Sequence, residues 1–371
     1  MHILFITRKH PPSIGGMQNL SYNLIQNFSK QGKERGDKIE TIILHKGQWH
    51  LFWWFPYALV LALKRARSVD IVHLGDPVLS LIGFLIRIFY RKPVVVTVHG
   101  LDLTFNLFLY QWYLKFFGRK FNCYVCISNY AREEAQNKGF SPCIVIPVGV
   151  DVNKRKAKSE KRKVLETNFF KKYNLPSDKH YLLTVGRLVQ RKGVYWFIDK
   201  VLPTLSPNTI YLVVGEGPER ERINKLVQKR GFQARVYLLG KISEEDLKTI
   251  YSLVDLFIMP NIKVPGDVEG FGLVAVEAAL SGLPVIAANL EGISDAVISG
   301  RNGILVEAEN PAAFQEQIVK FLNDKEYRKE FGRQAAYFTA KTYDWPIIAE
   351  RYYQEFLKLI NNQHKADFSD C

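Results

Sequence analysis

The stretch "VEGFGLVAVEAALSGLPVIA", from Val268 to Ala287, places two glutamates eight residues apart with glycines between them. Gly272 stands just before an apolar run of helical character, so we expect a helix to begin near it. Glu269 then lies in the preceding loop and Glu277 lies within the helix. The final "LPVIAA" is an apolar run typical of a buried strand. The stretch therefore predicts one loop, one helix and one strand of an α/β unit.

Similar short apolar runs alternate with helix-like segments along the whole chain, about six in each half. Many of them lack alternating polar residues, which predicts parallel strands covered by helices on both faces. A chain of 371 residues also exceeds what one core usually supports. We therefore predict an α/β protein with two doubly wound parallel sheets. The predicted strands lie within residues 2–7, 39–45, 70–75, 93–100, 123–128, 143–149, 180–186, 209–215, 235–240, 254–260, 283–288 and 302–307.

A charged, poorly periodic stretch separates the two halves. We place a first domain at residues 1–160, a second at 175–342 and a last helix at 343–362. Ile348, Tyr352, Phe356 and Ile360 would share one face of that helix.

The net charge of +15 and the pI near 9.5 favour anionic partners. Part of the excess lies in the basic run 153–163, either a solvated loop or a patch for lipid or phosphate. Three aromatic segments, 51–67, 78–92 and 105–120, end in basic residues and are shorter than the ~20 residues of a membrane span. They are either helices packed on a sheet or a surface that meets lipid headgroups.

Several absences narrow the class of protein. No signal peptide is evident, and four cysteines are few, which suits a reducing compartment. Cys123 and Cys126 fall in a strand, where their side chains point to opposite faces, so we expect core packing and not a metal site. Asp267 and Glu269 are two residues apart, but no third ligand is visible, so we expect no metal.

Polar residues follow several predicted strands, where parallel sheets bind ligands. His99, with Asp102 nearby, follows the fourth strand and could bind a substrate hydroxyl or serve the structure alone. Arg187 and Lys192 follow Gly186 at the first strand of the second half. Two cations near a helix start suit a pyrophosphate, although a solvated basic turn has the same composition.

Glycines add candidate contacts with an anion. Gly15 and Gly16 precede a helix and could expose backbone N–H groups, or simply form a turn. Gly217 lies in "VVGEGPER", which has Arg220 where a nicotinamide fingerprint needs a third glycine. At the opening stretch, Glu269 and Glu277 could accept hydroxyls on either side of the N–H groups that begin the helix. That arrangement fits a nucleotide-sugar, although a surface glutamate pair is the simpler alternative.

These motifs together resemble the retaining glycosyltransferases of family 4, also called group 1. The resemblance covers most of the chain and includes "PPSIGGMQN", "VHGLD", "IPVGVD", "VGRLVQRKG" and "PGDVEGFGLVAVEAALSGLPVIA". It implies the GT-B fold, in which two Rossmann-like domains face each other across a cleft. The first domain would bind the acceptor and the second the nucleotide-sugar, with the last helix crossing back to the first domain.

The resemblance also implies residue roles. Glu277 would bind ribose hydroxyls, Glu269 the donor hexose and His99 the sugar near its reacting carbon, while Arg187 and Lys192 would neutralise the leaving diphosphate. The candidate catalytic residues are His99, Arg187, Lys192 and Glu269. The candidate substrate-binding residues are Gly15, Gly16, Asp102, Gly186, Gly217, Phe271, Gly272, Leu273, Val274 and Glu277.

The expected activity is metal-independent transfer of a hexose from a UDP- or GDP-sugar to a glycan or lipid-linked acceptor in cell-surface polysaccharide or glycolipid synthesis. We expect no cofactor, no nucleic-acid partner and a cytoplasmic location, with an anionic membrane surface as a further partner of the first domain. Two alternatives remain open: a nucleotide-sugar epimerase of the same fold, and a non-enzymatic basic protein of membrane surfaces. Glu291–Gly292 departs from the family pattern, so no role is assigned to Glu291.

Overall fold

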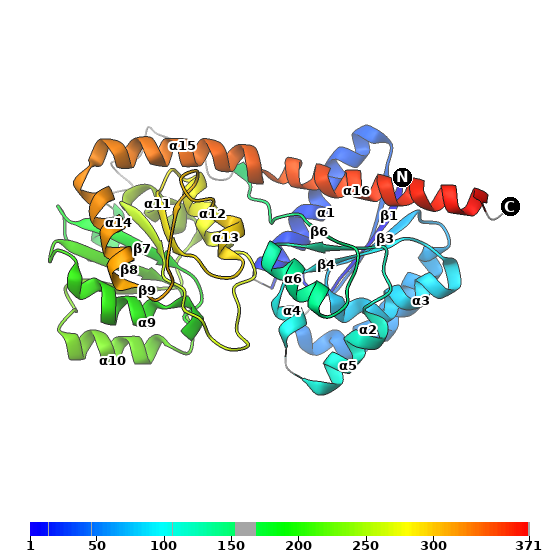
Figure 1. Cartoon of the computed structure of the whole chain (residues 1–371), viewed down its shortest axis with the longest axis horizontal. Coiled ribbons are helices and arrows are strands. Elements are labelled where there is room, and N and C mark those ends of the chain that lie inside the picture. The colour runs from blue at the N-terminus through cyan, green and yellow to red at the C-terminus, as the bar shows by residue number, and fades with distance from the viewer. Residues whose placement is uncertain (14, 46, 106, 153–167, 370–371) are drawn as a thin grey trace. The chain divides into compact units, whose positions relative to one another are not determined.

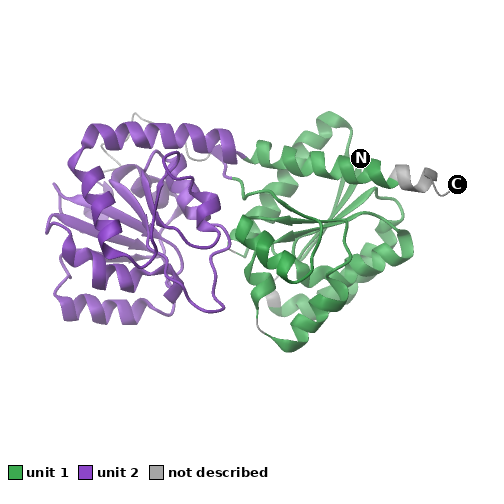
Figure 2. Ribbon diagram, viewed as in Figure 1, with its two compact units in different colours: residues 1–149, 345–371 green, residues 150–344 purple. Residues whose placement is uncertain are grey.

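The computed structural model describes residues 1–13, 15–45, 47–105, 107–152 and 168–369 (Figure 1). The chain forms two compact units: residues 1–149 with 345–371 make unit 1, and residues 150–344 make unit 2 (Figure 2). The basic run 153–163 lies outside the described residues. Each unit contains one six-stranded parallel sheet, which confirms the predicted fold class and all twelve predicted strands.

Unit 1 has the strand order β2-β1-β3-β4-β5-β6. All its strands are parallel, but the chain adds β2 on one side of β1 and the later strands on the other. This reversal of strand order between β1 and β3 is the point where open α/β sheets bind ligands. Its strands are β1 His2–Thr7, β2 Lys38–Ile43, β3 Ile71–Leu74, β4 Val94–Val98, β5 Cys123–Cys126 and β6 Cys143–Val145. Its helices are α1 Gly16–Arg35, α2 Leu51–Ala66, α3 Ser80–Tyr90, α4 Leu101–Thr104, α5 Phe108–Phe117, α6 Asn129–Asn137 and α16 Trp345–Ser369.

Helices cover both faces of the unit 1 sheet, with α1 and α16 on one side and α2, α3 and α5 on the other (Figure 1). Helix α16 packs against α1 through the aromatic pair Phe28–Phe356, whose ring centroids are 5.4 Å apart with an interplanar angle of 37°. Ile348, Tyr352 and Phe356 are fully buried, which confirms the predicted apolar face of the last helix. The cysteines of β5 are buried in the strand, as expected.

Unit 2 has the strand order β12-β11-β10-β7-β8-β9, so its reversal lies between β7 and β10. Its strands are β7 His180–Val185, β8 Thr209–Val214, β9 Val236–Gly240, β10 Leu256–Met259, β11 Val285–Ala288 and β12 Ile304–Val306. Its α-helices are α9 Val194–Trp196, α10 Arg220–Arg230, α11 Glu244–Leu253, α12 Leu273–Leu280, α13 Ile293–Ala296, α14 Pro311–Asn323 and α15 Lys325–Tyr343. The short 3-10 turn η4 Gln190–Lys192 precedes α9, which continues through the π turn η5 Phe197–Val201.

The core of unit 2 forms because its central strands are apolar along their whole length. Every residue of β8, β10 and β11 is buried. Helix α14 packs beside α9 through Trp196 and Phe314, and α15 lies along α12. Among the described residues of the whole chain, no helix combines the length and apolar character needed to cross a bilayer.

Candidate active site

A buried ion pair joins two loops at the reversal of the unit 2 sheet. Lys192 ends η4, which follows β7, and Glu269 lies in the loop after the neighbouring strand β10. The Lys192 Nζ donates to Glu269 Oε2 at 2.5 Å, and both side chains are largely buried. Parallel pairing of β7 with β10 therefore brings together two predicted catalytic residues that are 77 positions apart.

A second cation and an amide also approach the Glu269 carboxylate. Arg191 Nε lies 3.5 Å from Glu269 Oε2, and the Asn261 amide donates to the same oxygen at 3.2 Å. Burial by itself would raise the pKa of the Glu269 carboxyl, but the charges of Lys192 and Arg191 and these hydrogen bonds hold it below its ordinary value. Glu269 is therefore a carboxylate, able to accept hydrogen bonds from ligand hydroxyls.

Two polar atoms of this cluster make no hydrogen bond, although Arg191 Nε keeps its ion-pair contact with Glu269. Arg191 Nε and Asn261 Oδ1 are buried and have no hydrogen bond within the part of the chain that the structure describes. Unpaired buried polar atoms are rare, because each costs free energy unless water or a ligand pairs with it. The cluster thus has the character of a polar binding site.

Asp267 forms an ion pair with Arg191 next to the Lys192–Glu269 pair. Its carboxylate accepts from Arg191 Nη1 at 2.8 Å. No group of three or more His, Cys, Asp or Glu side chains among the described residues is arranged to hold a metal ion.

Three glycines let the surrounding loops dock on one another. A Cβ on Gly193 (φ 66°) would lie 1.8 Å from the carbonyl oxygen of Pro260, so the loop after β7 touches the loop after β10. A Cβ on Gly215 would lie 1.9 Å from a backbone oxygen of Gly186. Gly217 is a candidate substrate contact, and in this structure an added Cβ would lie 2.3 Å from the oxygen of Leu188. The loops of three strands therefore meet at one edge of the sheet.

Helix α12 begins at the predicted place. Gly272 is its N-cap and adopts a φ of 88°, which favours glycine. Phe271 is buried, with its ring 6.0 Å from that of Tyr343, so only its backbone is a candidate contact. Leu273 and Val274 form the first turn of the helix and are half-buried. Glu277 is half-buried in the second turn, as expected from the sequence.

Glu291 was given no role by the sequence, but it contacts the site. Its Oε2 accepts from the backbone N–H of Glu269 at 2.5 Å, and Gly292 N donates to the Glu269 carbonyl at 3.1 Å. Burial, together with the nearby charge of Glu269, raises the pKa of the Glu291 carboxyl. Glu291 therefore fixes the backbone of the loop that carries Glu269.

Unit 1 has its own polar cluster at the corresponding reversal. His99 follows β4, is buried, and its Nε2 lies 3.0 Å from the carbonyl oxygen of Gly75, which follows β3. A carbonyl can only accept, so Nε2 carries a proton; in the neutral imidazole Nδ1 then carries the lone pair. Both oxygens of Asp102 accept from the His99 backbone N–H at 3.0 Å. Burial raises the pKa of the Asp102 carboxyl.

Two further residues of this cluster escaped the sequence analysis. Arg8, after β1, donates from Nε to Asp76 at 3.0 Å, and Asp76 is completely buried. The second oxygen of Asp76 also lies 3.0 Å from Arg8 Nε, so the guanidinium faces both carboxylate oxygens. An acid directly after an apolar strand is the available signal for Asp76, but nothing in the local sequence pairs it with Arg8.

The remaining predicted residues lie at loop positions. Gly15 caps α1 and Gly16 begins it, and both are exposed. Gly186 lies against the Lys192 side chain, 3.5 Å from its Cε if a Cβ is added. Arg187 is exposed, and it is Arg191 that approaches Glu269. Within the described residues, Arg191 and Lys192 are thus the cations that approach Glu269. The expected role of Arg187 and Lys192 toward a leaving diphosphate stays a prediction.

Comparison with known families accounts for most of the chain. Residues 166–337 match the family model "Glycosyl transferases group 1", and residues 14–154 match "Glycosyltransferase Family 4". The Staphylococcus aureus capsular polysaccharide biosynthesis glycosyltransferase CapM is 25% identical over 96% of this chain and 97% of its own. A GDP-mannose-dependent α-(1-6)-phosphatidylinositol monomannoside mannosyltransferase of Mycolicibacterium smegmatis is 26% identical over 72% of this chain and 70% of its own.

Solved structures show the same fold. HepE of Anabaena in complex with UDP superposes with a TM-score of 0.77 at 18% identity, covering 96% of this chain and 100% of HepE. Sucrose-phosphate synthase of Thermosynechococcus elongatus also reaches 0.77, at 20% identity, covering 97% of this chain and 99% of its own. With the two six-stranded sheets, these likenesses establish the GT-B fold.

Proposed function

The chain belongs to the group 1 glycosyltransferases of family 4 and is therefore a transferase, and we propose that it moves a hexose from a nucleotide-sugar to a hydroxyl of a glycan or lipid-linked acceptor. We further propose that it retains the anomeric configuration and serves the synthesis of a cell-surface polysaccharide or glycolipid. Two relatives support this proposal: CapM is named for capsular polysaccharide biosynthesis, and the Mycolicibacterium enzyme is named for mannosyl transfer to a phosphatidylinositol mannoside.

The Lys192–Glu269 pair at the reversal of the unit 2 sheet is the observation that carries the proposal. Its carboxylate is held ionised and can accept sugar hydroxyls, while the adjoining ammonium suits a diphosphate. Asn261 Oδ1 and Arg191 Nε, which make no hydrogen bond among the described residues, are also atoms that a polar ligand would satisfy. Structures of HepE with UDP and with UDP-glucose support a nucleotide-sugar as the donor class.

In the proposed reaction the bond between the anomeric carbon and the diphosphate oxygen breaks, and its electron pair stays on the diphosphate. Lys192 and Arg187 stabilise the added negative charge as preorganised cations, without a metal. The acceptor hydroxyl attacks from the face that the diphosphate leaves and passes its proton to the departing diphosphate oxygen, so the configuration is retained. Placing both substrates in one site contributes the rest of the rate enhancement.

His99 and Asp102 have separate parts in this proposal. The His99 Nε2–H donates to the Gly75 carbonyl, which leaves Nδ1 of the neutral ring as the acceptor for a sugar hydroxyl. Asp102 holds the His99 backbone and so acts as a positioning residue. We also propose that the enzyme works in the cytoplasm, peripherally at a membrane face.

A thermal-shift series with UDP, GDP and ADP tests the donor proposal. A diphosphate at about 100 times its Kd should stabilise the folded protein by about 2.7 kcal/mol and thereby name the nucleotide. Glu277→Ala should weaken that ligand by roughly tenfold to a hundredfold, because hydrogen bonds to a charged group contribute about 1.5–3 kcal/mol. Stabilisation by none of the three would contradict the proposal. A product formed without any added acceptor would indicate an epimerase.

A further inference from the structure

Helix α2 of unit 1 packs on the sheet with its small side chains and turns its large ones outward. Ala58, Ala62 and Ala66, spaced by four residues, are fully buried. On other sides of the helix Trp53 is 77% exposed and Phe52 lies in the open beside it, with ring centroids 5.3 Å apart. A helix that only covered a sheet would bury its largest apolar side chains, because each contributes about 1.5–3 kcal/mol on burial.

Helix α5 repeats this inverted pattern. Phe108, Trp112 and Phe116 are spaced by four residues, lie on one face and are all exposed, Phe108 to 80%. The rings of Trp112 and Phe116 stack on each other with centroids 5.6 Å apart. Leu114 is the buried residue of this helix. The aromatic face is thus a second row of large apolar side chains without a covering element in unit 1.

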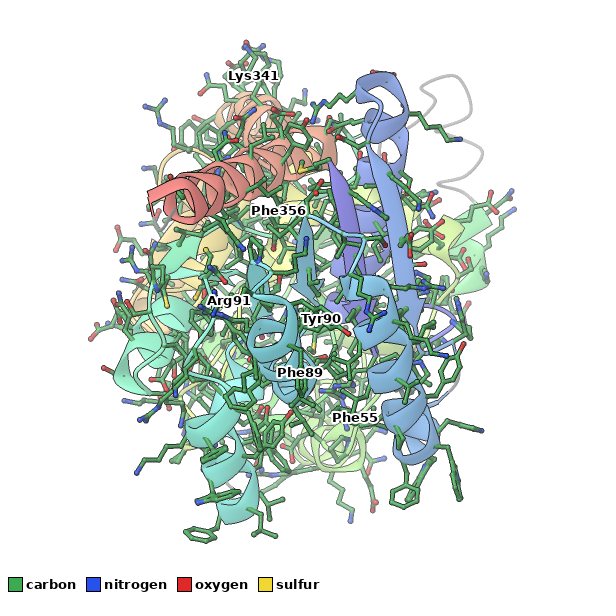
Figure 3. All side chains as sticks on the ribbon, turned by 90° about the vertical axis from the view of Figure 1, so that its right-hand side faces the viewer. Phe55, Phe89, Tyr90, Arg91, Lys341 and Phe356 are labelled. Carbon is green, nitrogen blue, oxygen red and sulfur yellow. The ribbon has the colours of Figure 1, made fainter. Side chains whose placement is uncertain are left out.

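Helix α3 connects the two rows. It packs against both α2 and α5, and its Phe84 ring lies 6.2 Å from that of Phe116. Phe89, near its end, is exposed. Figure 3 looks onto this side of unit 1, with Phe89, Tyr90 and Arg91 at the end of α3 and Phe55 on the neighbouring α2. We call Phe52, Trp53, Phe89, Phe108, Trp112 and Phe116 the aromatic surface. Isolated exposed apolar residues are ordinary, but a group of this kind marks an interaction site.

The segments that carry the aromatic surface contain basic but no acidic residues, and of their cations Arg65 also lies 3.4 Å from Glu40 of β2. Residues 48–69, 77–101 and 103–132, which contain α2, α3 and α5, include no aspartate or glutamate. Basic residues stand at or just beyond the end of each of these helices: Lys64 and Arg65, Arg91 and Lys92, Arg119 and Lys120. The intervening acids are turned inward, where Asp70 accepts from His2 N–H, Asp76 from Arg8 and Asp102 from His99 N–H.

We propose that the aromatic surface docks unit 1 on a bilayer that contains anionic phospholipid. Trp, Tyr and Phe side chains with neighbouring Lys and Arg are suited to the headgroup level, and each cation near an anionic surface strengthens binding by about fivefold. A second copy of the chain fits less well, since a two-fold contact would oppose the same basic patches. The inference rests on the proposed function in one respect: a lipid-linked acceptor would lie in that bilayer.

Vesicle flotation of the full chain tests this inference. One set of vesicles is phosphatidylcholine alone and the other is phosphatidylcholine with phosphatidylglycerol at three to one. We expect at least tenfold stronger binding to the anionic vesicles. The pair Trp53→Ser and Trp112→Ser should reduce it at least tenfold, as should Arg119→Glu with Lys120→Glu. The matched control is Tyr337→Ser on α15 of unit 2, where a 62% exposed ring should be dispensable.

Several outcomes would overturn the docking proposal. One is equal flotation of the wild-type chain with both kinds of vesicle, and another is unchanged flotation of the tryptophan variant. A third is a wild-type dimer in sedimentation that persists with and without lipid and becomes a monomer in the tryptophan variant. A second copy of the chain would then cover the aromatic surface. Each variant is also melted with the stabilising nucleoside diphosphate. If no nucleoside diphosphate raises the melting temperature of the wild-type chain, the proposed function is contradicted. If the diphosphate raises it but the wild-type chain does not float with anionic vesicles, only the docking proposal is contradicted.

Discussion

Replacing Lys192 by methionine tests whether the ion pair is the energetic centre of unit 2. The side chains of Lys192 and Glu269 are 10% and 13% exposed, and their charged atoms are 2.5 Å apart. Methionine keeps most of the length and apolar volume of lysine but removes the charge. The Glu269 carboxylate would then be held by Arg191 at 3.5 Å and by the Asn261 amide at 3.2 Å.

The size of the effect follows from this geometry. Removing one partner of a buried ion pair costs roughly 3–5 kcal/mol, because the other charge stays buried without compensation. The two remaining donors place Lys192→Met at the low end, about 3 kcal/mol. For a unit of this size about 1 kcal/mol shifts the melting temperature by about 2–4 °C, so we expect the unit 2 transition to fall by about 6–12 °C. Transfer should slow about 10²–10³-fold, the usual loss when a preorganised donor is removed.

Calorimetry of the single variants and the double variant separates the pair from its parts. Lys192→Met, Glu269→Gln and their combination form a double-mutant cycle, and we expect the double variant to be more stable than the sum of the singles predicts, by at least about 1 kcal/mol. Lys200→Met is the matched control, because the Lys200–Asp199 pair has a lysine that is 56% exposed and should contribute under about 1 kcal/mol. Additive effects in the cycle, or full transfer activity in Lys192→Met, would refute the reasoning.

Three further predictions concern pH and backbone geometry. Burial, with the nearby Glu269 charge, raises the Glu291 pKa, so stability falls as pH rises through that value; Glu291→Gln should therefore melt higher than wild type at pH 7 but equally at pH 4. Burial lowers the pKa of His73 to about 3, so the free energy of unfolding should be roughly 2 kcal/mol lower at pH 5 than above pH 6.5. Urea unfolding at several pH values should show a smaller decrease between pH 6.5 and pH 5 in His73→Gln. Gly215→Ala should destabilise by at least about 3 kcal/mol in thermal melts, because its Cβ would overlap a backbone oxygen, and clearly more than Gly231→Ala, which meets nothing within 4 Å.

The elements of the fold could be predicted from the sequence because their signals are local. A run such as "TIYLVV" in β8 is apolar after its first residue, Thr209, and in the structure all six residues are buried. The start of α12 was predictable in the same way, since Gly272 supplies the positive φ that begins the helix. The helical face of α16 follows from its periodicity, with Ile348, Tyr352 and Phe356 buried together.

The candidate site could be predicted only in part. The positions of Lys192 and Glu269 after strands pointed to one edge of a parallel sheet, and the structure pairs them. The approach of Arg191 to Glu269 could not be predicted from spacing, because several cations follow the same strand. The outcome depends on how the loop after β7 docks on the loop after β10 through Gly193. The contact of Glu291 with the Glu269 backbone has the same origin.

The sequence by itself determined the order of strands and helices, the helix start at Gly272 and the placement of charged residues at strand ends, because hydrophobic period and glycine conformation act over a few residues. Only the tertiary structure decided which charged groups meet and which helix faces are covered. Lys192 and Glu269 are 77 positions apart and meet because β7 pairs with β10. Helix α2 carries alanines and aromatic residues on different sides, and it is packing on the sheet that buries Ala58 and leaves Trp53 exposed. Side-chain partners depend on the meeting of distant loops, and that information is spread over the whole fold.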